Sequence, residues 1–415
     1  MIANGWTGGQ YSIFRALLAL YLFIHFVALM PYAAELFSSA GVLPDAAASP
    51  LAFAFPNLLV AFDPPWFAQL WVALGAALSI PLALGFRDRT AAIALWYVWA
   101  CLFGRNPLIA NPSIAYVGWM LLAHCALPKA PFGSWAARGR TDPRGGWSFP
   151  RPVYGAAWLA LAAGYSYSGY TKLVSPSWRD GSALRKIIEN PLARPGYVQD
   201  ALLRLPAELL RVPTWLALAL ELAFLPLALL SRARPWLWAA LLSMHLGLIA
   251  LIDFADLSVA MLLFHFLTFD PAWIRARLGP APERLFYDGA CGLCHRSVRL
   301  LLAEDRSGRA FRFSPIGSES FRGAIPEAQR AGLPLGVIVV RADGAVLVGA
   351  RAVRHSLHAL GGVWRLLALL LGLVPLPVLE LVYAGVARVR YRLFARPDAA
   401  CPIMPADLRA RFDTD

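Results

Sequence analysis

The stretch Leu285-Phe-Tyr-Asp-Gly-Ala-Cys-Gly-Leu-Cys-His-Arg-Ser-Val-Arg-Leu-Leu-Leu302 decides the fold of the C-terminal part of the chain. A short apolar strand at 285–287 runs into the turn pair Asp288-Gly289, and Cys291-x-x-Cys294 then opens a helical pattern. A strand, a tight turn and two cysteines at the start of a helix are the layout of a thioredoxin-like redox motif.

The two cysteines take different predicted roles. Unpaired N–H groups and the macrodipole at a helix N-terminus favour an anion, so a thiolate is stabilised there. We therefore expect Cys291 to be the attacking sulfur and Cys294, one turn later, to resolve the mixed disulfide. His295 and Arg296 would add positive charge. Half of a zinc site is the alternative, but no second cysteine or histidine pair follows at ligand spacing, so no metal is expected.

The octapeptide Tyr-Asp-Gly-Ala-Cys-Gly-Leu-Cys (287–294) resembles the signature of the DCC family of thioredoxin-like thiol–disulfide oxidoreductases. Further blocks are similar to that family: 348–352, 360–365, Tyr383, 388–394 and Cys401-Pro402. The likeness runs over 283–413. It implies thiol–disulfide exchange with a cellular thiol such as thioredoxin or glutathione as reductant. By analogy, Pro334 would be a cis-proline facing the disulfide.

The residue pattern of this part predicts an α/β domain. Helical patterns lie between the first and second strands, between the second and third, and after Arg351, and Asp343-Gly344 is a hairpin turn between the last two strands. The strand-like segments are 284–287, 310–314, 336–341 and 345–349. The order βαβαββα fits a thioredoxin-like core.

The composition of the whole chain is that of a membrane protein. Of 415 residues, 59% are hydrophobic and only 15% charged, and the mean hydropathy is +0.55. The net charge of +13 comes largely from arginines beside apolar runs, which is typical of cytoplasmic loops, so no nucleic acid partner is expected. Five cysteines, two of them in one motif, provide no disulfide framework. The first apolar run lacks a cleavage-site pattern and is expected to stay as a helix.

Eight apolar runs predict eight spans, two of which (91–103 and 257–267) are shorter than a straight crossing needs. Apolar and basic residues alternate at helical spacing in 173–212, which suits helices on the membrane surface. The apolar segment 366–382 is interrupted by prolines, and we expect it to pack or dock on the membrane rather than to form a ninth span. The predicted spans are 12–36, 66–86, 91–103, 111–127, 153–172, 213–230, 235–252 and 257–267.

Basic residues predict the orientation. They gather in the loops after the second, fourth, sixth and eighth spans, whereas the loop after the first has none. Both termini are therefore expected in the cytoplasm and the protein in the plasma (inner) membrane. The basic residues of 173–212 are the one feature that opposes this orientation.

Ionisable groups inside spans are costly and are therefore candidates for function. The run 164–181 resembles the segment that carries the catalytic lysine in vitamin K-dependent carboxylases and in the related horizontally transferred transmembrane (HTTM) domain. Lys172, Leu173, Trp178 and Gly181 match in order, and the surroundings of His245 and the loop Gly41-Val-Leu-Pro44 are also similar. The likeness covers 8–275.

The resemblance implies a quinone-like substrate and a role for Lys172 as the base that removes a proton from the reduced quinone. From the residues alone, the favoured interpretation is that Lys172 extends from a helix end to the lipid headgroups, and only the matching neighbours bring the two roles level. His245 is expected to be hydrogen-bonded inside the bundle, and His25, His124 and His265 carry weaker signals. Asn106 and Asn111 would line a cavity or cap helices.

The sequence thus predicts an α-helical membrane bundle of about eight spans (1–278, HTTM-like) followed by an α/β thioredoxin-like domain (283–415). The predicted function is a membrane-anchored thiol–disulfide oxidoreductase coupled to a quinone-like substrate, with no covalently bound cofactor. One alternative is a carboxylase- or oxygenase-like enzyme with Lys172 as base. Another is a transporter or scaffold with an attached redox sensor.

Overall fold

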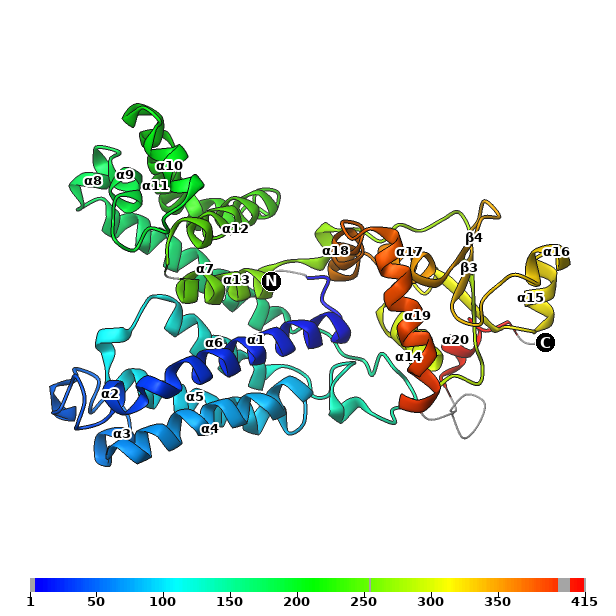
Figure 1. Ribbon diagram of the computed structural model, residues 1–415, viewed down its shortest axis with the longest axis horizontal. Coiled ribbons are helices and arrows are strands. Elements are labelled where there is room, and N and C mark those ends of the chain that lie inside the picture. The colour runs from blue at the N-terminus through cyan, green and yellow to red at the C-terminus, as the bar shows by residue number, and fades with distance from the viewer. Residues whose placement is uncertain (1–3, 254, 395–403, 414–415) are drawn as a thin grey trace. The chain divides into compact units, whose positions relative to one another are not determined.

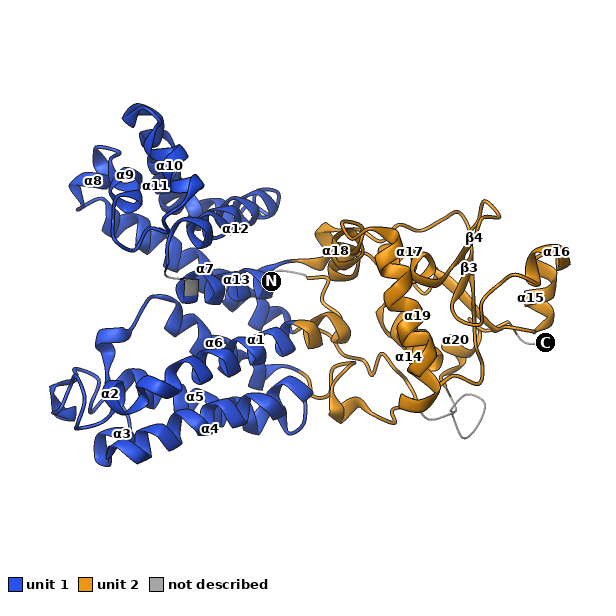
Figure 2. Cartoon of the chain, in the orientation of Figure 1, with its two compact units in different colours: residues 1–3, 14–127, 150–269 blue, residues 4–13, 128–149, 270–415 orange. Residues whose placement is uncertain are grey.

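The computed structural model describes residues 4–253, 255–394 and 404–413. The chain divides into two compact units, which Figure 2 colours separately. Unit 1 holds Phe14–Leu127 and Pro150–Phe269, and unit 2 gathers Asn4–Ile13, Pro128–Phe149 and Asp270–Asp415. Unit 2 therefore contains two segments from the N-terminal part of the chain. The division of the chain into domains 1–278 and 283–415, which rests on the sequence, stays a prediction.

Unit 1 is built from helices in the part that the structure describes (Figure 1). Helix α1 begins in the segment of unit 2 that precedes Phe14 and continues into unit 1. The helices are α1 (Gly8–Leu29), α2 (Ala33–Phe37), α3 (Leu58–Ala61), α4 (Pro65–Leu84), α5 (Asp88–Arg105), α6 (Ser113–Ala126), α7 (Arg151–Lys172), α8 (Pro176–Arg179), α9 (Ala183–Ile188), α10 (Tyr197–Leu203), α11 (Ala207–Ala228), α12 (Arg234–Leu251) and α13 (Ala255–Thr268).

Local sequence signals set the ends of these helices, as α4 shows. Pro65 stands at its first turn, where a missing N–H costs nothing, and Gly85 ends it in the left-handed region at φ 67°. Within α4, a Cβ on Gly75 would lie 2.6 Å from the ring of Phe26, so glycine lets α1 and α4 approach closely.

The eight predicted spans correspond to α1, α4, α5, α6, α7, α11, α12 and α13. Among the described residues, four helical stretches are long and apolar enough to cross a membrane: Gly8–Phe37, Pro65–Leu84, Ala207–Ala228 and Arg234–Leu251. The others fall short for physical reasons; α6 has only 14 residues, and α5 begins and ends on charged residues. Four candidate spans, or five with a bent helix pair in unit 2, indicate a multi-pass membrane protein.

Unit 2 contains a four-stranded mixed sheet in the order β2-β1-β3-β4. Strand β1 (Glu283–Tyr287) pairs in parallel with β2 (Phe311–Pro315) and antiparallel with β3 (Ile338–Val340), which pairs antiparallel with β4 (Val346–Val348). The predicted order of strands and helices is confirmed. The hairpin turn is also confirmed, since the Arg341 N–H donates to the Ala345 carbonyl at 3.0 Å.

Each face of this sheet carries its own apolar cluster. Alternate residues of β1 point to opposite sides, so Leu285 and Tyr287 join the cluster that contains the two motif cysteines, while Phe286 packs against Phe321. The helices of unit 2 are α14 (Gly292–Glu304), α15 (Glu319–Ala324), α16 (Glu327–Arg330), α17 (Gly349–Leu360), α18 (Gly362–Leu371), α19 (Leu376–Leu393) and α20 (Ala406–Arg409). The pair α18 and α19 is bent by 111°.

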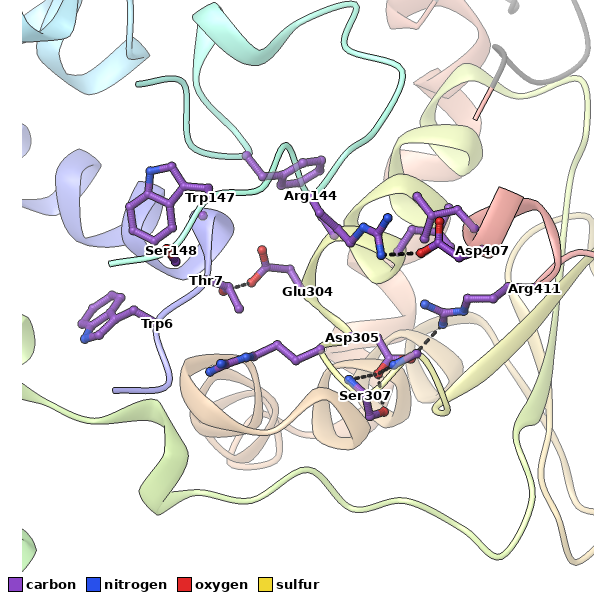
Figure 3. A pocket seen from close by; sticks show the side chains of 17 residues that line it. Trp6, Thr7, Arg144, Trp147, Ser148, Glu304, Asp305, Ser307, Asp407 and Arg411 are labelled. Atoms are coloured by element: carbon purple, nitrogen blue, oxygen red, sulfur yellow. Dashed lines mark hydrogen bonds and ion pairs between the residues drawn. The ribbon is translucent and has the colours of Figure 1, made fainter. Parts of the chain in front are cut away.

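Within unit 2, a buried carboxylate at the end of α14 holds the segment that precedes Phe14. Glu304 accepts hydrogen bonds from the Thr7 hydroxyl, from the Gly9 N–H at 2.8 Å and from the Trp364 indole N–H at 2.6 Å. Figure 3 shows Thr7 and Glu304 at a cavity of about 420 Å³. Burial raises the pKa of Glu304, an effect that the hydrogen bonds from Thr7 and Trp364 oppose.

Candidate functional site

The structure places Cys291 at the N-cap of α14 and Cys294 in its first turn. The Cys291 sulfur accepts the Cys294 N–H at 3.4 Å, and the Cys291 N–H donates to the Asp288 carbonyl at 3.2 Å. Both cysteines are free thiols and both are buried, with 0% and 4% of their surface exposed. A sulfur that accepts a helix N-terminal N–H is in the position that stabilises a thiolate.

Asp288 fixes the turn that presents the first cysteine. Its Oδ1 accepts the Ala290 N–H at 2.9 Å, which holds the turn between β1 and α14. Its Oδ2 accepts the guanidinium of Arg390 at 3.1 Å and the hydroxyl of Tyr391. The carboxylate therefore ties the cysteine turn to α19, which packs on α14 (Figure 1).

Arg390 supplies the buried positive charge of the site. Only 5% of it is exposed, and its charge acts on both thiols. Burial raises the pKa of the Cys294 thiol, and the neighbouring Cys291 sulfur raises it further, while Arg390 partly opposes both effects. A protonated Cys294 beside Cys291 suits the resolving role. Sequence reasoning did not single out Arg390 or Tyr391 for a role in the site.

His295 and Arg296, which we expected to add positive charge at the cysteines, contact other groups instead. The His295 Nε2 bonds to the Gly289 carbonyl at 2.9 Å, so this ring closes the turn. The guanidinium of Arg296 lies over the ring of Phe394.

The predicted cis-proline at Pro334 is wrong, because the described residues contain no cis peptide bond. The loop before β3 is held instead by Arg390, which donates to the Leu335 carbonyl at 3.0 Å. Cys401 lies outside the described residues.

In the observed arrangement, the Cys291 sulfur is closed off from solvent. Cys291 has no exposed surface, yet thiol exchange requires the attacking sulfur to touch a sulfur of the partner. For such an exchange, the residues that cover the Cys291 sulfur would have to move first.

In unit 1, the structure places Lys172, which is partly buried, at the end of α7 in an ion pair with a buried carboxylate. Its ammonium lies 2.5 Å from the carboxylate of Glu221 on α11 and 4.5 Å from the centre of the Trp178 ring. Glu221 is only 2% exposed. A lysine that acts as a base needs a neutral amine, whereas a carboxylate in contact favours the ammonium. The pair therefore gives no support to the role of Lys172 as a base.

His245 lies in a second polar cluster of unit 1. The Tyr165 hydroxyl is 2.8 Å from the Nε2 of His245 and 3.3 Å from the Nε2 of His265. The Nδ1 of His265 lies 2.9 Å from the Met261 carbonyl and so donates to it. The structure thus brings together α7, α12 and α13 through one tyrosine and two histidines.

Comparisons with known proteins identify the domain that contains the cysteine pair. Residues 285–396 match the family described as DCC1-like thiol-disulfide oxidoreductase. The chain is 30% identical over 135 residues to the uncharacterized protein YuxK of Bacillus subtilis (strain 168), covering 32% of this chain and 94% of that protein. It is 28% identical over 115 residues to the chloroplastic DCC family protein At1g52590 of Arabidopsis thaliana, covering 28% of this chain and 66% of that protein.

No solved structure matches the chain. The HTTM-like character of residues 8–275 stays a prediction. The two cysteines of the site and the turn that holds them lie within the matched residues. Through this C-terminal domain, the chain belongs to the DCC1-like thiol-disulfide oxidoreductase family.

Proposed function

We propose that this protein is a membrane-anchored thiol–disulfide oxidoreductase that works through Cys291 and Cys294. The observation that carries the proposal is the pair of free thiols at the start of α14, where the Cys291 sulfur accepts a helix N–H beside the charge of Arg390. Family membership supports the same chemistry.

The proposed reaction transfers two electrons. The Cys291 thiolate attacks one sulfur of a substrate disulfide, forms a mixed disulfide and releases the other sulfur as a thiolate. Cys294 then loses its proton and attacks the Cys291 sulfur, which releases the second substrate thiol. The product is a Cys291–Cys294 disulfide, and a cellular thiol such as glutathione or thioredoxin reduces it for the next cycle.

The test uses the full chain in lipid nanodiscs, reduced and then freed of reductant. With a small aromatic disulfide as substrate, we expect one disulfide to be cleaved per chain, and continued turnover once glutathione is added. Cleavage no faster than in empty nanodiscs would overturn the proposal.

We predict that the redox domain faces the cytoplasm, as the distribution of basic residues indicates. A phosphatase that is active only outside the cytoplasm should be inactive when fused after Asp415, whereas a fluorescent protein fused there should fold and emit. An active phosphatase fusion would place the domain on the opposite side.

We propose further that the thiol pair exchanges electrons with a quinone-like molecule of the membrane. The balanced step converts the dithiol and a quinone into the disulfide and a hydroquinone. The apolar spans support this proposal, because a quinone-like molecule dissolves in the membrane that such spans would cross. In the part of the chain that the structure describes, no specific contact favours a carboxylase, an oxygenase or a transporter.

Anaerobic absorbance of a quinone added to the reduced protein tests this coupling. We expect hydroquinone to form with the wild type and with Cys125→Ser, and the rate to fall to background in Cys291→Ser. Equal rates in the wild type and Cys291→Ser would show that the thiols do not reduce the quinone.

A further inference from the structure

A cavity of about 610 Å³ in unit 1 belongs to neither polar cluster described above. Its walls come from α1, the turn after it, α2, the end of α5, the segment between α5 and α6, and the start of α13. Most lining side chains are apolar, and four of the polar ones are joined by hydrogen bonds. The lining residues are Tyr21, Ile24, His25, Ala28, Leu29, Tyr32, Leu36, Phe103, Ile109, Asn111, Asp256 and Val259.

The polar wall is organised around Asp256. Its Oδ1 accepts the Tyr21 hydroxyl at 2.8 Å and the His25 Nδ1–H at 2.9 Å, and its Oδ2 accepts the Asn111 amide at 3.3 Å. The partners are held in turn: the Asn111 side chain accepts the Ser113 N–H, and the His25 ring lies 4.9 Å from that of Trp99. The wall is therefore in place before any ligand arrives.

This carboxylate has bonding capacity left over on the side of the cavity. A carboxylate offers about four acceptor sites, and among the described residues Oδ2 has only the Asn111 contact, which is longer than an ordinary hydrogen bond. The Asp256 side chain keeps 34% of its surface exposed, and the described residues that line the cavity include neither lysine nor arginine. A carboxylate left in such surroundings is costly unless a further donor reaches it.

The cavity lies beside a stretch that is long and apolar enough to cross a membrane. Ile24 of α1 is 58% exposed and Tyr32 is 56% exposed, and both line the cavity within Gly8–Phe37. A ligand would therefore enter from the lipid. Its volume lies within the range of about 300–1,000 Å³ that small-molecule sites occupy.

We propose that this cavity binds a lipid-soluble molecule with an apolar body and one hydroxyl head, and that the hydroxyl donates a hydrogen bond to Oδ2 of Asp256. A neutral hydroxyl fits better than an ammonium, because bringing a charge into apolar surroundings costs far more. The site is independent of the thiol chemistry of unit 2.

The test is photolabelling of the full chain in lipid nanodiscs by a long-chain alkylphenol that carries a diazirine in its alkyl chain. The matched control probe is the methyl ether of the same phenol, which has lost the donor. We expect saturable labelling of cavity residues by the phenol and labelling at least about tenfold weaker by the ether, which corresponds to about 1.4 kcal/mol.

Two substitutions and a control locate the interaction. Asp256→Asn should weaken phenol labelling about tenfold, whereas Asp253→Asn, at an exposed aspartate nearby, should leave it unchanged. Ala28→Phe fills the cavity from an exposed position that disturbs no core contact, and should block labelling in a normally folded chain. Equal labelling by the phenol and its ether, or wild-type labelling in Ala28→Phe, would overturn the proposal.

Discussion

Replacing Cys291 with serine is expected to reduce disulfide cleavage to the uncatalysed background, while Cys294→Ser retains the first step and stops there. The thiolate is the nucleophile in exchange, and a serine hydroxyl at Cys291 cannot replace it. In Cys294→Ser no second thiol attacks the mixed disulfide, so the substrate stays bound through Cys291. Intact-mass measurement without reductant should show one substrate thiol added per Cys294→Ser chain and none per Cys291→Ser chain.

The other cysteines serve as matched controls. Cys101 and Cys125 lie in unit 1, and Cys401 belongs to a block that resembles the family, yet we expect serine at each of them to leave cleavage intact. A mixed disulfide trapped in Cys401→Ser would mean that the resolving thiol is not Cys294. A mixed disulfide on any cysteine other than Cys291 would assign the nucleophile elsewhere.

Replacing Arg390 with methionine is expected to slow the alkylation of the two thiols strongly. Arg390 is the buried cation whose charge acts on both cysteines, and a nearby positive charge favours the thiolate. Without it, the pH profile of alkylation should move to higher pH. The alkylation rate at pH 7 should then fall, by up to about tenfold for a shift of one unit.

Two further variants separate charge from packing. Arg390→Lys keeps a positive charge and should recover part of the rate, whereas Arg388→Met removes an exposed arginine of the same helix and should change nothing. Arg390→Met also leaves the Asp288 carboxylate without its ion-pair partner, so the melting temperature has to be measured alongside. An unchanged alkylation profile in a destabilised Arg390→Met chain would make the residue purely structural.

The thiol motif and the strand order could be predicted because their signals are local. A strand, an Asp-Gly turn and two cysteines lie within 285–302, and each strand carries its own alternation. Arg390 could not be assigned to the site in the same way, because 102 residues separate it from Asp288 along the chain. The prediction of a cis-proline at Pro334 rested on analogy alone. Tertiary contacts decide between the cis and trans isomers of such a bond.

In the membrane half, too, contacts between residues far apart in the chain could not be predicted from local signals. Lys172 was singled out from its own surroundings, but its partner Glu221 follows 49 residues later. A carboxyl group inside the predicted span 213–230 was a usable signal, although nothing local shows which residue it faces. Asp256 immediately precedes the predicted span 257–267 and meets Tyr21 across 235 residues. His25 and Asn111 thus carried weak signals alone and form a site only in three dimensions.

We propose that Cys291 and Cys294 form a reversible redox pair. The most direct test equilibrates the full chain in nanodiscs with glutathione buffers from reducing to oxidising, traps free thiols by alkylation and maps the peptides by mass. We predict one disulfide, between Cys291 and Cys294, that forms and disappears with the buffer while Cys101 and Cys125 stay alkylated throughout. If both motif cysteines remain alkylated even in the most oxidising buffer, after unfolding has exposed them to the alkylating reagent, the pair is not a redox centre.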